Sequence, residues 1–250
     1  MSWRNTAGRS DRPVLTVDKY RHELKYICSD MELRIVEQKL KAVMKPDPHA
    51  DRNGEYLIRS VYFDDCQRSR FFENEDGVDP REKFRIRTYN CSDARITLEK
   101  KIKNHGMTGK RSCLIDRDMC IRMLAGQSVS DHFGQHPLLD EWIVQRETAG
   151  LRPVMLGEYV RKPYVYPAGN VRITFDRYIC ASYRVRDIFE ARTSRIAVLP
   201  TGYHVLEVKY DDFLPDVIYQ LIDNGHMRQT NFSKFYLGCR AIGGRVNEMP

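Results

Sequence analysis

The sequence predicts an α+β fold in which antiparallel strands form a barrel with a charged interior and helices lie around it. Two observations support this prediction. Short segments that alternate polar and apolar residues dominate the 250-residue chain, and their polar positions carry many lysines, arginines and glutamates. Because alternate residues of a strand point to the same side, each of these strands has one charged and one apolar face.

The stretch KFRIRTYN at 83–90 shows this alternation most clearly. Lys83, Arg85 and Arg87 share one face, and Phe84 and Ile86 lie on the other. The same pattern recurs in four further segments: YRHELKY (20–26), ITLEKKIK (96–103), VRITFDR (171–177) and YHVLEVKY (203–210).

Three of these strands place a glutamate two residues before a lysine: Glu23/Lys25, Glu99/Lys101 and Glu207/Lys209. A sheet with one face in water would explain any single strand. Glu23 and Glu99 also have the alternative role of simple ion pairing with a neighbouring lysine. Five such strands together favour a closed barrel whose charged faces line a wide interior.

Helical periodicity appears between and after the strands. Ser29 and Glu32 form a capping box, and Leu33, Val36 and Leu40 follow at helical spacing, so we expect a helix that ends before Pro46. Further helices are predicted at 137–148, 215–221 and 232–241. Strands are predicted at 18–27, 56–64, 81–90, 94–103, 110–116, 154–166, 170–177, 179–185 and 203–210.

The organisation predicted from composition is simple. We find no compositional break inside the chain and expect one domain over 18–241, a flexible tail at 1–17 and a C-terminal tail at 242–250. No apolar run is long enough to cross a membrane, and the polar N-terminus lacks a signal-peptide core. The seven cysteines are odd in number and form no C-x-x-C pair, which favours reduced thiols in the cytoplasm. The sequence leaves open whether the protein binds a partner in a membrane.

The charge of the chain indicates the class of ligand. The net charge is +7, and basic proteins often bind polyanions. Cations gathered in a barrel interior are costly unless counter-charges compensate them, and a polyphosphate ligand supplies such charges. Arginine binds phosphate oxygens bidentately, lysine acts as a point charge, and glutamates hold a divalent metal that bridges to phosphates. Nucleic acid is disfavoured because the aromatic residues lie mainly opposite the cations and would not stack on bases beside them.

An ordered set of motifs resembles a known family. The motifs are RHELKY (21–26), IRSVYFDD (58–65), REKFRIRTY (81–89), LEKKIK (98–103), YVRKPY (159–164), VRITFDR (171–177), LEVKY (206–210) and FSKF (232–235). From about Tyr20 to Gly238 the chain resembles the vacuolar transporter chaperone (VTC) domain, a member of the triphosphate tunnel metalloenzyme superfamily. The resemblance implies a tunnel of antiparallel strands. It also implies polyphosphate synthesis from ATP, with release of ADP and dependence on Mn²⁺ or Mg²⁺.

The resemblance also implies roles for individual residues. The expected catalytic residues, which hold the reacting phosphates, are Lys25, Arg85, Arg87, Arg172 and Lys209. The expected substrate-binding residues are Arg59, Lys101, Arg161, Ser233 and Lys234, where the last two precede a final helix whose free amides would favour phosphate. The expected metal ligand is Glu207, with Glu23 as a weaker candidate.

The chain departs from the family pattern at two places. Asn231 stands where the polymerase members commonly have lysine, and the first strand has only Glu23 before its lysine. Two alternatives to the polymerase therefore stay open: a triphosphatase, in which Glu23 or Glu99 would act as base, and a polyphosphate-binding module without turnover. The presence of Glu207 favours catalysis.

Overall fold

The computed structural model describes residues 19–223, 225 and 227–246. The predicted N-terminal tail at 1–17 lies outside these residues. The strands are β1 (His22–Ser29), β2 (Lys45–Pro46), β3 (Tyr56–Asp64), β4 (Arg81–Tyr89), β5 (Ser92–Asn104), β6 (Met107–Ile115), β7 (Arg152–Tyr166), β8 (Val171–Ser182), β9 (Ile196–Ala197) and β10 (Tyr203–Tyr210). The α-helices are α1 (Asp30–Lys41), α2 (Ser69–Glu75), α3 (Arg117–Leu124), α4 (Pro137–Ala149), α5 (Asp216–Ile222) and α6 (Lys234–Val246).

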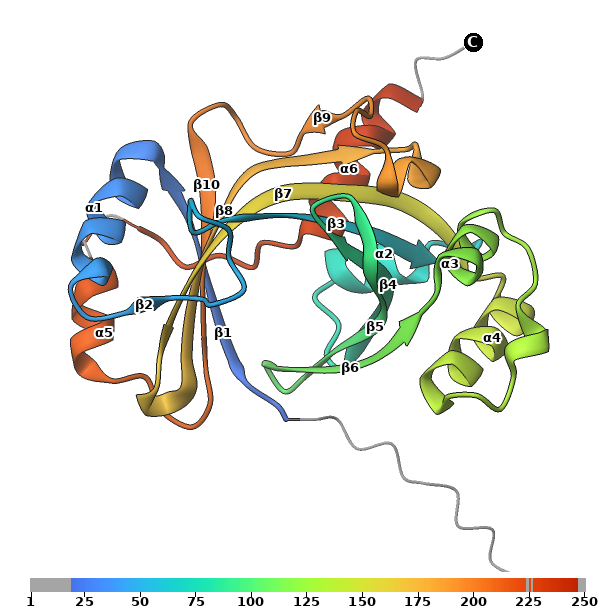
Figure 1. The fold of residues 1–250 in the computed structure, drawn as a ribbon, viewed down its shortest axis with the longest axis horizontal. Helices are drawn as coiled ribbons and strands as arrows, with labels where there is room; N and C mark the ends of the chain where they lie inside the picture. Colours follow the sequence, from blue (N-terminus) through green and yellow to red (C-terminus); the bar gives the residue numbers. More distant parts are fainter. Residues whose placement is uncertain (1–18, 224, 226, 247–250) are drawn as a thin grey trace, which may run out of the picture.

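All strands belong to one curled antiparallel sheet, as the sequence predicts (Figure 1). Its order is β1-β10-β8-β7-β3-β4-β5-β6, with β2 beside β7 and β9 beside β8. The two edges of this sheet meet where Arg21, just before β1, exchanges backbone hydrogen bonds of 2.9 Å with Thr108 of β6. The tunnel fold follows from this curl, because alternate residues of every strand then face a common interior.

Two groups of helices cover the outer face of the sheet (Figure 1). The capping box of Ser29 and Glu32 starts α1 as predicted, and α1 and α5 pack over the apolar residues of β8 and β10. On the other side, α3 and α4 cover β4 and β5, where Phe84 and Ile86 are buried against Leu138 and Trp142. The apolar face of KFRIRTYN therefore points outward to helices, as expected from its alternation.

The last helix lies on the opposite, concave face. α6 packs on β7 and β8, and its Phe235 and Cys239 join Tyr62 and Met155 in an apolar cluster. A Cβ at Gly238 would come within 2.7 Å of the Met155 side chain, so glycine permits this close approach. α6 thereby fills part of the barrel interior and brings its N-terminus into the remaining space.

The structure corrects two boundaries and adds two α-helices to those predicted, α2 and α3. The strands predicted at 170–177 and 179–185 are one strand, β8, in which Tyr178 has a positive φ of 53° beside a register shift of the β7–β8 pairing. The predicted C-terminal tail begins too early, because α6 continues to Val246; residues 247–250 lie outside the described residues. α2 was not predicted from its sequence, and it begins where the carboxylate of Asp64 accepts hydrogen bonds from the amides of Arg70 and Phe71.

Candidate active site

A cavity of about 390 Å³ opens inside the barrel, on the charged faces of the strands. Among the described residues that line it, eleven are lysine or arginine and two are glutamate. The cations come from β1, β4, β5, β6, β7, β10 and α6. Strands far apart in sequence thus direct positive charge to one enclosed space, which is the environment that a polyanion requires.

Ten of the twelve residues predicted as site residues line this cavity. They are Glu23, Lys25, Arg85, Arg87, Lys101, Arg161, Glu207, Lys209, Ser233 and Lys234. The remaining two, Arg59 and Arg172, do not contribute to its lining.

The prediction that Arg59 is a tunnel residue is wrong in its placement. Its side chain is 1% exposed and lies on the outer face of β3, where its Nε donates to Glu158 at 2.7 Å. Its Nη1 donates to three backbone carbonyls of the segment 187–190. Arg59 lies on the same strand face as Val61 and Phe63, whereas Ser60 lies on the other face. The apolar residues two and four positions after Arg59 therefore indicated an outer position in the sequence.

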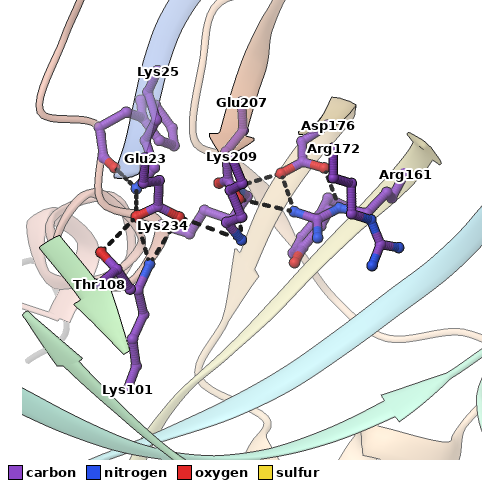
Figure 2. Close-up of polar contacts among 12 residues, drawn as sticks. Glu23, Lys25, Lys101, Thr108, Arg161, Arg172, Asp176, Glu207, Lys209 and Lys234 are labelled. Carbon is purple, nitrogen blue, oxygen red and sulfur yellow. Dashed lines mark hydrogen bonds and ion pairs between the residues drawn. The ribbon is translucent and has the colours of Figure 1, made fainter. Parts of the chain in front are cut away.

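Arg172 lies on the predicted face of its strand, but its side chain contacts residues outside the cavity lining. It lies on the same face of β8 as Asp176, and Figure 2 shows it beside Arg161. Its Nη2 donates to Asp47 at 2.7 Å and to the Tyr56 hydroxyl at 2.8 Å. These contacts hold the guanidinium outside the described lining of the cavity.

Glu207 is the centre of the ion-pair network in the cavity (Figure 2). Its carboxylate lies 2.5 Å from Lys209 Nζ, 3.8 Å from Lys234 Nζ and 3.9 Å from Arg161 Nη2. Burial would raise the pKa of Glu207, but Lys209, Lys234 and Arg161 hold this pKa well below its usual 4.5. Glu207 is therefore an anion at neutral pH.

Glu23 and Lys101 form a second pair across the barrel. Lys101 Nζ donates to both carboxylate oxygens of Glu23, at 2.8 and 3.1 Å, and Lys25 and Lys209 also lie within 3.4 Å of Glu23. Burial lowers the pKa of Lys101 to about 7, although Glu23 opposes this shift. The ion pairing that the sequence left as an alternative for Glu23 is thus present, and the residue still faces the cavity.

Arg85 and Arg87 share the carboxylate of Glu99 from the neighbouring strand. Arg85 Nε donates to Glu99 at 2.7 Å, and Arg87 Nη1 lies 3.9 Å away. Arg87 also donates to Ser60 and to the Tyr159 hydroxyl, both at 3.1 Å. These fixed contacts orient both guanidinium groups before any ligand arrives.

Asp176 was missed in the assignment of site residues. Its fully buried carboxylate accepts two hydrogen bonds from Arg161, at 2.7 and 2.8 Å, and contacts Lys234 Nζ at 2.6 Å. The position of Asp176 on the charged face of VRITFDR was visible in sequence, but its two partners come from β7 and α6. Asp176 thus ties the first residue of α6 to the barrel wall.

The start of α6 has the geometry expected from the sequence. Ser233 Oγ accepts a hydrogen bond of 3.3 Å from the amide of Tyr236, as a helix-capping residue does, and Lys25 Nζ donates to the Phe232 carbonyl at 3.1 Å. Asn231, where polymerase members of the family commonly have lysine, also lines the cavity.

The aromatic residues of the cavity differ from the expectation. Tyr62, Tyr159, Phe232 and Phe235 line it, so aromatic rings are not confined to the opposite faces. The Tyr159 ring has Lys234 Nζ 4.8 Å from its centroid and Arg161 at 5.3 Å. These rings position cations by cation–π contacts.

The cavity offers two carboxylates as oxygen ligands for a divalent metal, those of Glu23 and Glu207. Glu207 and Glu23 both contact Lys209, at 2.5 and 3.4 Å, so their carboxylates converge on one region. Among the described residues, no group of three or more His, Cys, Asp or Glu side chains is placed to hold a metal. Mg²⁺ sites commonly use one or two carboxylates together with substrate phosphates. The donor set fits a metal site that the substrate completes.

Comparison of the sequence with family models decides the family. The model of the VTC domain matches residues 20–242, nearly the whole described chain. The chain belongs to the VTC domain family. No curated protein matches it significantly.

Solved structures similar to this VTC domain come from several organisms. A Hippeastrum protein described as an adenylyl cyclase with a dominant triphosphatase activity is 13% identical, with a TM-score of 0.52 over 87% of this chain and 94% of that one. PH1819 of Pyrococcus horikoshii is 15% identical, with a TM-score of 0.46 over 87% and 97% of the two chains. A Bacillus halodurans protein described as an adenylate cyclase is 15% identical, with a TM-score of 0.47 over 82% and 88%. At 13% identity, the likeness to the Hippeastrum protein shows a shared fold.

Within the described part of the chain, no helix has the length and apolar character needed to span a bilayer.

Proposed function

We propose that this VTC domain is a phosphotransferase that synthesises polyphosphate from ATP and releases ADP, with Mn²⁺ or Mg²⁺. The observation that carries the proposal is the enclosed cavity in which eleven described cations face two glutamates. Phosphoryl transfer needs positioning and charge stabilisation more than covalent help from the protein, and this cavity provides both. The free cysteines of the structure fit the cytoplasmic location that we propose for the reaction.

The arginines and lysines of the cavity have different roles in binding phosphate. Arg85 and Arg87, held by Glu99, present guanidinium groups that bind phosphate oxygens in a fixed orientation. Lys25, Lys209 and Lys234 add charge from β1, β10 and α6. Positive charge fixed before the reaction stabilises the charge that spreads over the transferred group in the transition state.

The transfer itself balances without a general base. An anionic oxygen of the acceptor phosphate attacks the γ-phosphorus of ATP and forms a new P–O bond. The bond between the γ-phosphorus and the β–γ bridging oxygen breaks, and ADP leaves with its electron pair. A divalent cation bound by Glu207, with Glu23 as a second ligand, would supply Lewis-acid polarisation of the phosphoryl group.

Hydrolysis of a triphosphate is the second candidate. Asn231 in the cavity favours it, since polymerase members commonly have lysine there, and the Hippeastrum neighbour is described as having triphosphatase activity. Water would then need a base. Burial would raise the pKa values of Glu23 and Glu99, but nearby cations hold both well below 4.5, so each is a poor base at neutral pH. This argument favours phosphate as the acceptor.

The test is product analysis. Pure protein is incubated with ATP and Mn²⁺, with and without pyrophosphate as primer, and the products are separated by chain length. A ladder of phosphate chains with ADP is expected, and Glu207→Ala should lower its rate by about 10²-fold or more. Glu147→Ala, which removes an exposed glutamate of α4, is the matched control and should keep the rate.

The other outcomes are equally informative. Free phosphate without a ladder would move the protein to the triphosphatases. Tight polyphosphate binding without turnover would make it a binding module. In that case, Asn231→Lys would show whether the missing lysine is responsible.

A further inference from the structure

The segment 183–195, which joins β8 to β9, carries four arginines and no lysine (Figure 1). It includes a short 3₁₀ helix at Val185–Phe189 and lies against β3, β7 and α3 on the outer face of the sheet. The structure describes the whole segment, and none of its residues lines the cavity. We name its exposed arginines the arginine surface: Arg184, Arg186, Arg192 and Arg195.

One buried ion pair holds this segment in a fixed conformation. Arg59 Nη1 donates to three backbone carbonyls of the segment 187–190. Arg59 also binds Glu158, and the second oxygen of that carboxylate accepts a hydrogen bond from Arg195 at the end of the segment. Because both parts are attached to the same buried pair, the arginine surface has a fixed backbone, and a partner would not have to order it on binding.

Most of the arginine surface lacks a counter-charge within the protein. Among the described residues, no carboxylate oxygen lies within 4.0 Å of the side-chain nitrogens of Arg184, Arg186 or Arg192. The carboxylate of Asp187, in the same segment, instead accepts a hydrogen bond of 2.9 Å from the Thr193 hydroxyl. Three exposed guanidinium groups are therefore available to a partner.

The residue types of this surface are those of a protein interface. Arginine and tyrosine are enriched in protein–protein interfaces, whereas lysine is depleted. Tyr183, whose side chain is 53% exposed, directly precedes Arg184. Glu190 is exposed between Arg186 and Arg192 in the sequence. A carboxylate among the cations repels the phosphates of a nucleic acid or an anionic bilayer, but it suits a protein partner that carries charges of both signs.

We propose that the arginine surface binds an acidic segment of another protein, whose aspartate or glutamate side chains pair with the arginines. A guanidinium group binds a carboxylate through two parallel hydrogen bonds, so arginine gives such a contact direction as well as charge. The surface lies on the face of the sheet opposite the cavity, and binding there does not use the phosphate site. The inference is therefore independent of the proposed function.

A synthetic acidic peptide tests both the position and the strength of binding. The probe has glutamate at every second position, a fluorescent label and a photo-reactive group. Fluorescence anisotropy at low salt measures its affinity, and mass spectrometry of the cross-linked protein locates it. We expect cross-links within 183–195. The variant Arg184→Gln/Arg186→Gln/Arg192→Gln should bind the peptide about tenfold more weakly, because three exposed ion pairs of modest strength are lost together.

The matched control removes the same charge from exposed arginines elsewhere, in the variant Arg34→Gln/Arg52→Gln/Arg95→Gln. It should keep the wild-type affinity for the peptide. Both variants should unfold at the wild-type temperature, since none of the six side chains has an ion-pair partner among the described residues. Both should also keep the wild-type rate of product formation from ATP, so the peptide assay and the activity assay give separate answers.

Several results would overturn the inference. They are no binding of the peptide to the wild type, an equal loss of affinity in the control variant, or cross-links confined to the cavity segment 229–235. Tighter binding of single-stranded DNA or of phosphatidylserine vesicles, lost in the arginine variant, would assign the surface to a nucleic acid or a membrane instead. Sedimentation of the protein alone tests a second copy as the occupant: self-association that the arginine variant loses would replace the partner protein by another copy of this chain.

Discussion

Two groups of buried charges lie on opposite faces of the same sheet and differ in how they are balanced. On the outer face, the guanidinium of Arg59 faces Glu158 and three backbone carbonyls, and Arg195 also contacts Glu158. On the inner face, cations exceed carboxylates around Glu207 and Glu23. The outer group is satisfied by the protein alone, whereas the inner group needs a ligand to complete it.

This difference separates buried charges that stabilise the fold from buried charges that indicate a binding site. A buried ion that has a full set of partners contributes to the fold, and its removal damages the fold. A buried excess of one sign costs stability in the free protein, and a ligand of opposite sign recovers that cost. The comparison leads to three predictions, from the largest expected effect to the smallest.

Arg59→Met tests the outer group. The change leaves Glu158 and three carbonyls with fewer donors in a buried place, and we expect a loss of about 3–5 kcal/mol in the free energy of unfolding. Urea denaturation measures this loss, with exposed Arg95→Met as control. A loss below about 1 kcal/mol, with the control unchanged, would show that Arg59 is not a structural ion.

Proton uptake tests the inner group. Lys83 faces Arg81 on its own strand, Lys101 on β5, Lys25 on β1 and the Cys239 thiol on α6, and its pKa lies well below 10.5. A bound phosphate chain favours the ammonium form and raises this pKa. At a pH between the pKa of Lys83 in the free protein and its pKa in the complex, binding of the phosphate chain should therefore take up protons. The affinity for the chain should fall as the pH rises through this range.

Calorimetry in buffers of different ionisation enthalpy measures this uptake. Lys83→Met should lower the number of protons bound per polyphosphate, and Lys39→Met should leave it unchanged. An identical uptake in wild type and Lys83→Met would show that the charge of Lys83 does not depend on the ligand.

Lys110→Ala should have the smallest effect. Its Nζ lies 3.2 Å from Glu99, but its side chain is 49% exposed. Solvent screens such a pair, so we expect a loss of at most about 1 kcal/mol in the free energy of unfolding. Urea denaturation beside Arg59→Met provides the comparison; a loss as large as that of Arg59→Met would remove the distinction between the two groups.

The alternation of residues predicted much of the site because each strand has only two faces. For KFRIRTYN the face opposite the cations carries Phe84 and Ile86, which predicts that the cations face the interior. The strand around Arg59 is buried on both faces, and the family resemblance placed Arg59 in the tunnel although Val61 and Phe63 share its face. The alternation was the better guide there.

Asp176 and Lys83 show the limit of sequence patterns. The strand faces of both could be predicted, but their importance depends on partners remote in sequence. Asp176 binds Arg161 and Lys234, and Lys83 lacks a carboxylate because none of the neighbouring strands places one there. No local pattern contains that information.

The sequence by itself determined the strands, their charged faces, the first helix with its capping box and the family, because these depend on local periodicity and on motifs in order. Only the tertiary structure decided which charges are compensated, since ion pairing depends on the register between strands and on where α6 enters the barrel. Short-range periodicity sets the direction of each side chain; the packing of remote segments sets its electrostatic environment.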